Sequence, residues 1–132
     1  MESTVLVIKD ETSGGKILNE ININLETNRL TVREIIEARV LHEVNAYNER
    51  LPEYYSGLVQ PSNAEKTLNG YKIPNRKKID PEQQVYVALD AFQRNGYFIL
   101  INNKQAESLE QEVQLKPETV VSFLKLTPLI GG

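Results

Sequence analysis

Hydrophobic and polar positions near the start of the chain predict a β-hairpin. Thr4 to Ile8 is rich in β-branched residues, and Gly14-Gly15 closes the turn that follows. In the second arm, glutamate and asparagine occupy one face, and the apolar residues occupy the other, namely Ile17, Ile21, Ile23 and Leu25. This period of two is typical of a half-buried strand. The first arm is apolar on both faces, which favours a central position in the sheet.

A helical period replaces this alternation from Thr31 onward. Thr31 followed by Glu34 is the pattern of a capping box. Apolar residues then recur every three or four positions, at Val32, Ile36, Val40, Val44 and Tyr47, with Ile35 and Leu41 widening the stripe. The pattern predicts a helix that lays one face across the sheet and ends near Arg50-Leu51-Pro52.

The period fades between Leu51 and Asp80, where prolines and glycines interrupt the chain. We interpret residues 51–80 as an ordered insertion, because a long loop without structure is uncommon in a compact domain unless it is functional or disordered. Its largest apolar side chains are Tyr54, Tyr55 and Tyr71. They form a candidate partner surface, also for self-association. The alternative is that they close a local core.

A second helix and two more strands complete the pattern. Asp80 followed by Pro81 and Gln83 predicts the start of the helix, and Asn95-Gly96 predicts its end. Its expected buried face is Val85, Ala88, Leu89 and Phe92.

Tyr97 to Ile101 is the expected third strand, and an irregular connection follows through Leu109, Val113 and Leu115. The last strand, from Val120 to Leu126, is apolar on both faces and is therefore expected to be central, beside and parallel to the first strand. Phe123 and Ile36 are expected to be buried.

The end of the sequence is Thr127-Pro128-Leu129-Ile130-Gly131-Gly132. Pro128 cannot donate to a sheet ladder, so the tail is expected to begin where regular structure stops. A C-terminal carboxylate is ionised at neutral pH, and glycines without a Cβ can enter a narrow channel and present the carbonyl to a nucleophile. The alternative is a terminal linker without function.

Composition excludes several classes of function. The 132 residues, 40% hydrophobic and 25% charged, suit one globular domain, and the net charge of −3 is dispersed, unlike the basic face of a nucleic-acid binder. Arg76-Lys77-Lys78 is interpreted as a solvated loop. No apolar run approaches the length of a membrane span, and the start lacks the pattern of a signal peptide, so we expect a cytoplasmic protein without membrane partners.

Candidate catalytic chemistry is scarce. The absence of cysteine excludes disulfides, a thiol nucleophile and thiolate metal ligands, and the single histidine, His42, excludes a histidine metal cluster and leaves a catalytic triad unsupported. Gly14-Gly15-Lys16 lacks the upstream glycine of a phosphate loop, and Glu110 and Glu112 are interpreted as solvated carboxylates. We therefore expect no enzyme activity, no metal and no bound cofactor.

The order of elements is that of an α+β protein of the β-grasp class, and one segment adds a resemblance. Ile99 to Gly132 resembles the C-terminal part of the sulfur-carrier proteins of molybdopterin and thiamin biosynthesis. The shared features are Ile101-Asn102, Leu109, the Leu-Lys-Pro-Glu-Thr-Val turn of 115–120 and the closing Pro-Leu-Ile-Gly-Gly. It is also similar to ubiquitin-like modifiers that bacterial operons encode beside activating, conjugating and metallopeptidase-like enzymes. The small sulfur carriers lack so long an insertion.

This resemblance implies a ubiquitin-like β-grasp domain over 1–126 and a flexible tail over 127–132. It implies that an activating enzyme uses MgATP to adenylate the carboxylate of Gly132 and passes the chain through a thioester to a target protein. A conjugating enzyme and a deconjugating peptidase are the further implied partners. Gly131, Ile130, Leu129 and Pro128 are the implied recognition residues of the tail. Two alternatives remain: a sulfur carrier with a thiocarboxylate at Gly132, and an interaction module whose Gly-Gly end has no role.

Overall fold

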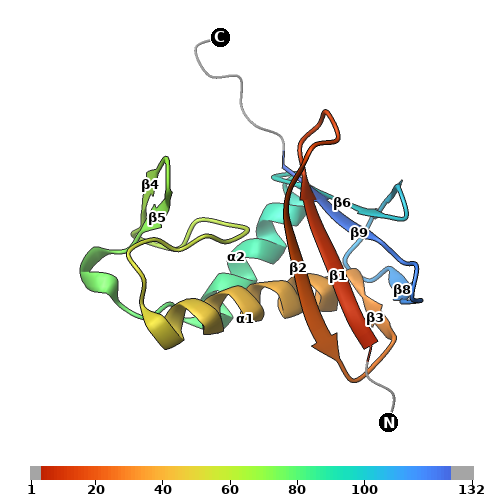
Figure 1. The fold of residues 1–132 in the computed structure, drawn as a ribbon, viewed down its shortest axis with the longest axis horizontal. Helices are drawn as coiled ribbons and strands as arrows, with labels where there is room; N and C mark the ends of the chain where they lie inside the picture. Colours follow the sequence, from red (N-terminus) through yellow and green to blue (C-terminus); the bar gives the residue numbers. More distant parts are fainter. Residues whose placement is uncertain (1–3, 126–132) are drawn as a thin grey trace. The chain divides into compact units, whose positions relative to one another are not determined.

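The computed structural model describes residues 4–125, and the fold is α+β, consistent with the predicted β-grasp class (Figure 1). The described chain divides into two compact units, one of residues 4–34 with 92–125 and the other of residues 35–91. The boundaries fall inside the two helices, α1 (Val32–Arg50) and α2 (Pro81–Gln93).

The first unit is organised by a mixed five-stranded sheet in the order β2-β1-β9-β6-β7. Its strands are β1 (Thr4–Glu11), β2 (Ile17–Leu25), β6 (Phe98–Ile101), β7 (Lys104–Gln105) and β9 (Val121–Leu124). β1 and β9 run parallel, whereas every other neighbouring pair is antiparallel. The prediction that the first and last strands are adjacent, parallel and central is therefore confirmed.

One face of this sheet forms the core of the first unit. Leu6 lies opposite Ile23, Ile8 lies beside Val121, and Ile99 lies opposite Phe123. Phe123 is fully buried, as predicted, and its ring stacks on that of Tyr97 with 5.7 Å between centroids. The apolar period of two thus places side chains from β2, β1, β9 and β6 into a shared layer, whereas both residues of the edge strand β7 are exposed.

Although the sequence of β1 is apolar on both faces, the structure does not bury both of them. Val5 is 51% exposed and lies opposite Asn24, whereas its neighbour Leu6 is 1% exposed. β1 is central because β2 and β9 bind both of its edges. A strand is central when neighbouring strands bind both of its edges, whereas the burial of its faces depends on what packs against the sheet. The apolar residues of β1 relate only to its faces.

A second sheet of two short strands replaces part of the connection that was expected to be irregular. β3 (Arg29–Thr31) pairs antiparallel with β8 (Glu112–Gln114), and this places the buried Leu30 opposite the buried Val113. The N–H groups of Val32 and Arg33 then donate to the carbonyls of Gln111 and Leu109, both at 2.9 Å. These bonds satisfy two donors of the first helical turn that have no partner within the helix.

Two turns of the first unit set the path into β9. The N–H of Asn102 donates to the carbonyl of Val120, and the side-chain oxygen of Asn102 accepts the N–H of Val120, both at 2.9 Å. Asn102 has φ 49, a left-handed conformation that asparagine tolerates. Further along, the N–H of Lys116 donates to the hydroxyl of Thr119 at 2.8 Å.

Helix α1 begins and ends as its sequence predicts. The Thr31 hydroxyl accepts the N–H of Glu34 at 3.2 Å, and the Glu34 carboxylate accepts the N–H of Thr31 at 2.9 Å, which completes the capping box. After Arg50, Leu51 takes φ 47 and donates its N–H to Tyr47 at 2.7 Å, and Pro52 follows.

The buried residues of α1 include Ile36, as predicted, and the full set is Val32, Ile35, Ile36, Arg39, Val40, Val44 and Tyr47. Leu41 was expected to widen this stripe, but it is 39% exposed. Arg39 is buried in its place. The apolar period locates the buried side of the helix but does not specify that a cation lies on it.

Helix α2 also keeps its predicted ends. One carboxylate oxygen of Asp80 accepts the N–H of Glu82 at 3.1 Å, and Asn95 takes φ 62 directly after the last turn. Ala88 and Phe92 are buried as expected, whereas Val85 and Leu89 are half-buried. The buried polar residue Gln84 was not expected on this side.

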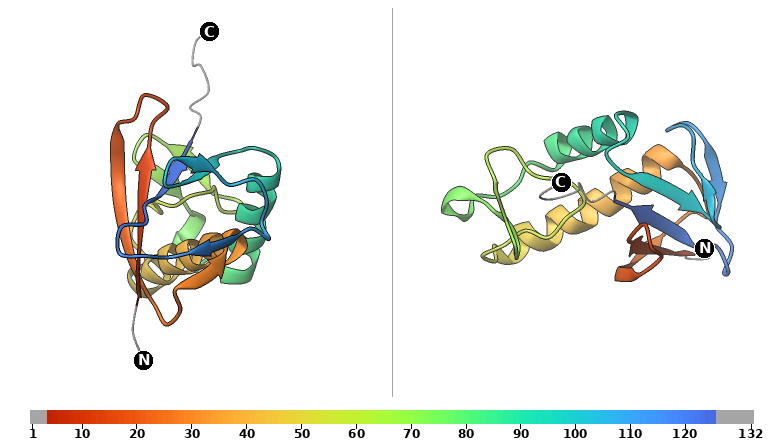
Figure 2. Two further views of the ribbon diagram at one scale, coloured as in Figure 1. Left: turned by 90° about the vertical axis from the view of Figure 1, so that its right-hand side faces the viewer. Right: turned by 90° about the horizontal axis from the view of Figure 1, so that it is seen from above.

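The insertion forms regular elements within the second unit. It contains a hairpin of β4 (Glu65–Thr67) and β5 (Gly70–Lys72), then a 3-10 turn, η1 (Pro74–Arg76). Figure 2 shows the chain looping from the end of α1 through these elements to the start of α2.

Phe123→Ala tests the core of the first unit. Its side chain is 0% exposed, so truncation removes buried area and leaves a cavity, and we expect a loss of about 3 to 5 kcal/mol in the free energy of unfolding. Leu18→Ala is the control, because Leu18 is 63% exposed, and its expected loss is within about 0.5 kcal/mol. Equal losses in urea unfolding would contradict this core assignment.

Candidate functional site

The predicted reactive tail lies outside the described residues. Gly132, Gly131, Ile130, Leu129 and Pro128 all belong to it. The structure does describe β9, the strand that precedes the tail in sequence. Val121, Ser122 and Phe123 are all at most 4% exposed, so the last regular element before the tail is held within a buried sheet.

The three tyrosines of the insertion have different surroundings. Tyr55 is 2% exposed, and its ring lies 5.5 Å from that of Tyr47 and 6.5 Å from that of Tyr71, measured between centroids. Tyr54 and Tyr71 are half-buried. Tyr55 therefore closes a local core, and a partner surface of this region can include only Tyr54 and Tyr71 among the three.

Tyr55 also ties the hairpin to this core through its backbone. Its N–H donates to the carbonyl of Tyr71 at 2.8 Å, and its own carbonyl accepts the N–H of Tyr71 at 2.9 Å. Gly57 lies against the Tyr55 phenol so closely that a Cβ at this position would overlap the ring. Burial, and next the nearby Glu43 carboxylate, raise the pKa of Tyr55 well above its usual value, so the phenol stays neutral.

A buried ion pair on α1 lies beneath the insertion. The guanidinium of Arg39 lies 3.3 Å from the carboxylate of Glu43, and the two side chains are 2% and 7% exposed. The second carboxylate oxygen of Glu43 accepts the N–H of Leu58 at 3.1 Å. Glu43 thus neutralises a buried cation and at the same time binds the backbone of the insertion.

Two side-chain amides hold further backbone of the second unit. Asn48 donates to the carbonyl of Ile79 and accepts the N–H of Ile79, both at 2.8 Å. Gln84 donates to the carbonyl of Val59 at 2.8 Å. Irregular backbone that is buried needs such partners, because it has no ladder to satisfy its polar groups.

The sequence interpretation did not identify these four polar residues. Arg39 and Glu43 stand three positions after the predicted core residues Ile36 and Val40. That spacing is a usable signal, because residues three or four apart share a helix face. Asn48, four positions after Val44, and Gln84, four before Ala88, share this spacing. Their partners are backbone atoms of the insertion, which the sequence pattern does not place.

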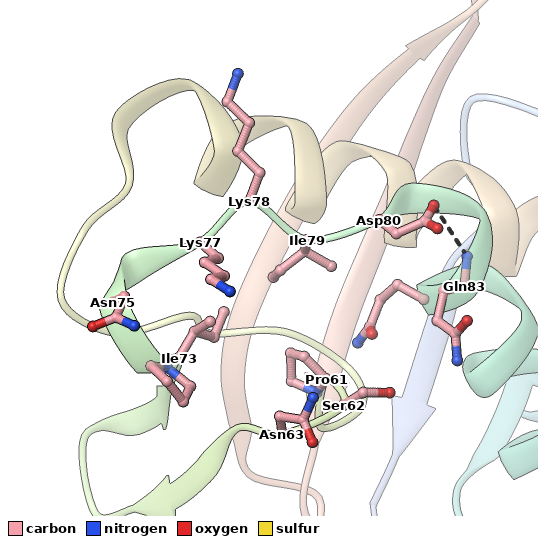
Figure 3. Close-up of a pocket in the computed structure, with 12 residues that line it drawn as sticks. Pro61, Ser62, Asn63, Ile73, Asn75, Lys77, Lys78, Ile79, Asp80 and Gln83 are labelled. Carbon is pink, nitrogen blue, oxygen red and sulfur yellow. Dashed lines mark hydrogen bonds between the residues drawn. The ribbon is translucent and has the colours of Figure 1, made fainter.

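A pocket of about 670 Å³ opens within the second unit (Figure 3). Its apolar lining is Pro61, Ile73, Pro74 and Ile79, and its polar lining is Ser62, Asn63, Asn75, Lys77, Lys78, Asp80, Gln83 and Gln84. Lys77 directs its ammonium group into the space between Ile73 and Ile79, whereas Lys78 points away from the pocket (Figure 3).

The described residues offer little else for chemistry. Over 4–125 no group of three or more His, Asp and Glu side chains is placed to hold a metal ion, and His42 is exposed. Glu110 lies 3.2 Å from Arg33 at the surface, and Glu112 is exposed in β8. Neither helix of the described chain has the length and apolar character needed to cross a membrane.

Comparison of the chain with protein-family models, with curated proteins and with solved structures finds no match. The candidate sites therefore rest on the geometry and on the sequence motifs.

Glu43→Ala tests the buried ion pair. It leaves Arg39 buried without its carboxylate and removes the acceptor of the Leu58 N–H, so we expect a loss of about 3 to 5 kcal/mol in the free energy of unfolding. The double variant Arg39→Met with Glu43→Leu should lose less than Glu43→Ala, because no charge remains buried. If the double variant loses more, the pair does not act as a neutralised unit.

Gly57→Ala tests the contact with the Tyr55 ring. The added methyl group has to displace a buried aromatic side chain, and we expect a loss of about 1 to 3 kcal/mol in thermal or urea unfolding. Gly14→Ala is the matched control, since its Cβ would meet only the Thr12 hydroxyl at 3.8 Å. Similar stabilities of the two variants would refute the close packing.

Proposed function

We propose that this protein is a ubiquitin-like protein modifier, a substrate of enzymes and not itself an enzyme. Its reactive group is the α-carboxylate of Gly132. Its partners are an activating enzyme, a conjugating enzyme, a target protein and a deconjugating peptidase. It binds no cofactor of its own, and MgATP belongs to the activating enzyme.

The observation that carries the proposal is the place of the resembling motifs in the first unit. Asn102 and the 115–120 turn both bind the backbone that leads into β9, through the bonds of Asn102 to Val120 and of Lys116 to Thr119. Leu109 is buried and accepts the N–H of Arg33. The motifs thus lie next to β9, the strand that precedes the Gly-Gly tail in sequence, in a sheet that is compatible with a β-grasp.

The proposed chemistry uses the tail as an acyl donor. The Gly132 carboxylate attacks the α-phosphorus of ATP, pyrophosphate leaves, and a mixed anhydride forms. A thiolate of the activating enzyme attacks the carbonyl and AMP leaves, which gives a thioester. An amine of the target then displaces the thiolate. The chain itself has no cysteine and supplies only the acyl group.

The insertion favours a modifier over a sulfur carrier. A carrier needs only its tail and a surface for the activating enzyme, whereas a modifier is read by further partners. The insertion carries an exposed apolar side chain on a hairpin: Leu68, between β4 and β5, is fully exposed, and the Thr67 hydroxyl donates to the carbonyl of Gly70 at 2.6 Å. A binding surface with a defined backbone loses less conformational entropy when a partner binds.

Deleting Gly132 should abolish activation and leave stability unchanged. The measurement is ATP–pyrophosphate exchange by the activating enzyme, isolated from an extract of the source cells on the immobilised full-length chain. We expect exchange with the full chain, none with the deletion, and equal urea-unfolding curves for the two proteins. Exchange that persists without Gly132 would refute the role of its carboxylate.

Gly131→Val should slow the exchange by at least about tenfold while Gly14→Ala does not. A β-branched side chain next to the attacked carbonyl restricts the backbone and adds bulk where the tail enters the activating site. Gly14 lies in the β1–β2 turn and serves as a control for replacement of a glycine elsewhere. An unchanged rate of ATP–pyrophosphate exchange with Gly131→Val would indicate that the activating enzyme does not contact the tail closely at Gly131.

A further inference from the structure

Side-chain hydrogen bonds hold residues that line the pocket of the second unit and residues next to them. Asn48 holds both backbone groups of Ile79, and Gln84, which is 1% exposed, holds the carbonyl of Val59. The side chain of Gln60 donates to the carbonyl of Ala64 at 2.8 Å, a bond that spans the lining residues Pro61, Ser62 and Asn63 in sequence. Ile73 and Ile79 are each at most 9% exposed and form part of the floor. A preformed cavity of about 670 Å³ is in the usual range for ligand sites.

One cationic side chain, Lys77, points into this pocket and suits an anionic group. Arg76, Lys77 and Lys78 follow one another, and none of their side chains forms an ion pair within residues 4–125. Lys77 aims its ammonium group between the two isoleucines (Figure 3). The chain as a whole has a net charge of −3, so this concentration of positive charge is local. A carboxylate bound to the Lys77 ammonium would lie beside the apolar side chains of Ile73 and Ile79.

The pocket is poorly suited to a nucleotide or a free phosphate. No aromatic residue lines it, so a base has no ring to stack on. The first N–H groups of α2 are bound by Asp80, at 3.1 Å for Glu82 and 3.5 Å for Gln83, and the Asp80 carboxylate adds negative charge there. A phosphate would therefore have one inward-pointing lysine and no cradle of N–H groups.

The same pocket suits an extended peptide. Pro61, Pro74, Ile73 and Ile79 can take an apolar side chain. The amide side chains of Asn63, Asn75 and Gln83 lie around them and bind no other group in the described chain, so they can pair with the N–H and C=O groups of a bound main chain. Lys77 can take a neighbouring carboxylate.

We propose that this pocket binds a short extended segment of a partner protein in which an apolar side chain stands beside an aspartate or glutamate. The apolar side chain occupies the floor formed by Ile73 and Ile79, and the carboxylate binds Lys77. The inference goes beyond the proposed function, because the pocket consists of insertion and α2 residues and uses no atom of the Gly131-Gly132 tail.

The test is an NMR titration of the 15N-labelled full-length chain with a pool of acetylated, amidated hexapeptides. The peptides alternate Asp or Glu with Leu, Ile, Val or Pro. We expect saturable shifts at the amides of Ile73, Lys77 and Ile79. Lys77→Gln should weaken binding about fivefold, the upper range for one exposed ion pair. Lys78→Gln is the matched control and should change binding less than twofold, since Lys78 points away (Figure 3).

Three results would overturn the proposal. They are the absence of saturable shifts at the pocket, equal shifts with a pool that carries lysine at the acidic positions, and equal weakening by Lys77→Gln and Lys78→Gln. Inorganic phosphate is titrated in parallel, and if it alone reproduces the shifts, the site is a small-anion site. The chain without Gly131-Gly132 should bind the acidic pool unchanged, so this test can fail while the tail chemistry stands, and the reverse also holds.

Discussion

The parallel pairing of β1 with β9 is the interaction on which the first unit depends. It joins Ile8 to Val121 and Asp10 to Phe123, residues from opposite ends of the described sequence. Such a contact cannot form locally, because the intervening chain must first be brought together at an entropic cost. Burial of Ile8, Val121 and Phe123 opposes that cost by about 1.5 to 3 kcal/mol for each side chain. The sheet order, and the strand that precedes the tail, both follow from this pair.

The second unit contains a long segment that has little regular structure. Its hairpin and 3-10 turn satisfy only part of the backbone. Side chains of the helices satisfy more: Glu43 binds Leu58, Asn48 binds Ile79, and Gln84 binds Val59. These bonds hold irregular chain in one conformation, and this is the physical reason that a preformed pocket can exist there. The side chains that make these bonds are polar groups on the helices, of which Glu43 and Gln84 are buried and Asn48 is half-buried.

Sequence pattern predicted the features that depend on local rules. The capping box of α1 and the helix ends were confirmed because each depends on a few neighbouring residues. The period of two in β2 holds from Ile21 to Leu25, whereas Ile17, expected on the same face, is 52% exposed. Features that depend on tertiary contacts could not be predicted from local sequence patterns. Arg39 is buried and Leu41 is exposed. The partner of Arg39, Glu43, binds backbone of the insertion, a contact that the period of α1 does not report. β3 and β8 are three residues each, too short for a period to appear. The sequence left the three tyrosines open between a local core and a partner surface, and only their burial and contacts separate Tyr55 from Tyr54 and Tyr71.

The central claim is that Gly132 becomes joined to a target protein, and product analysis by mass spectrometry tests it most directly. The full chain is incubated with the activating enzyme, MgATP and cell extract, then digested with trypsin. Cleavage after Lys125 leaves residues 126–132 on any modified amine. We expect target peptides that carry this branch through Gly132. A free chain in which sulfur replaces one oxygen of the carboxyl group, or a chain that remains unaltered, would contradict it.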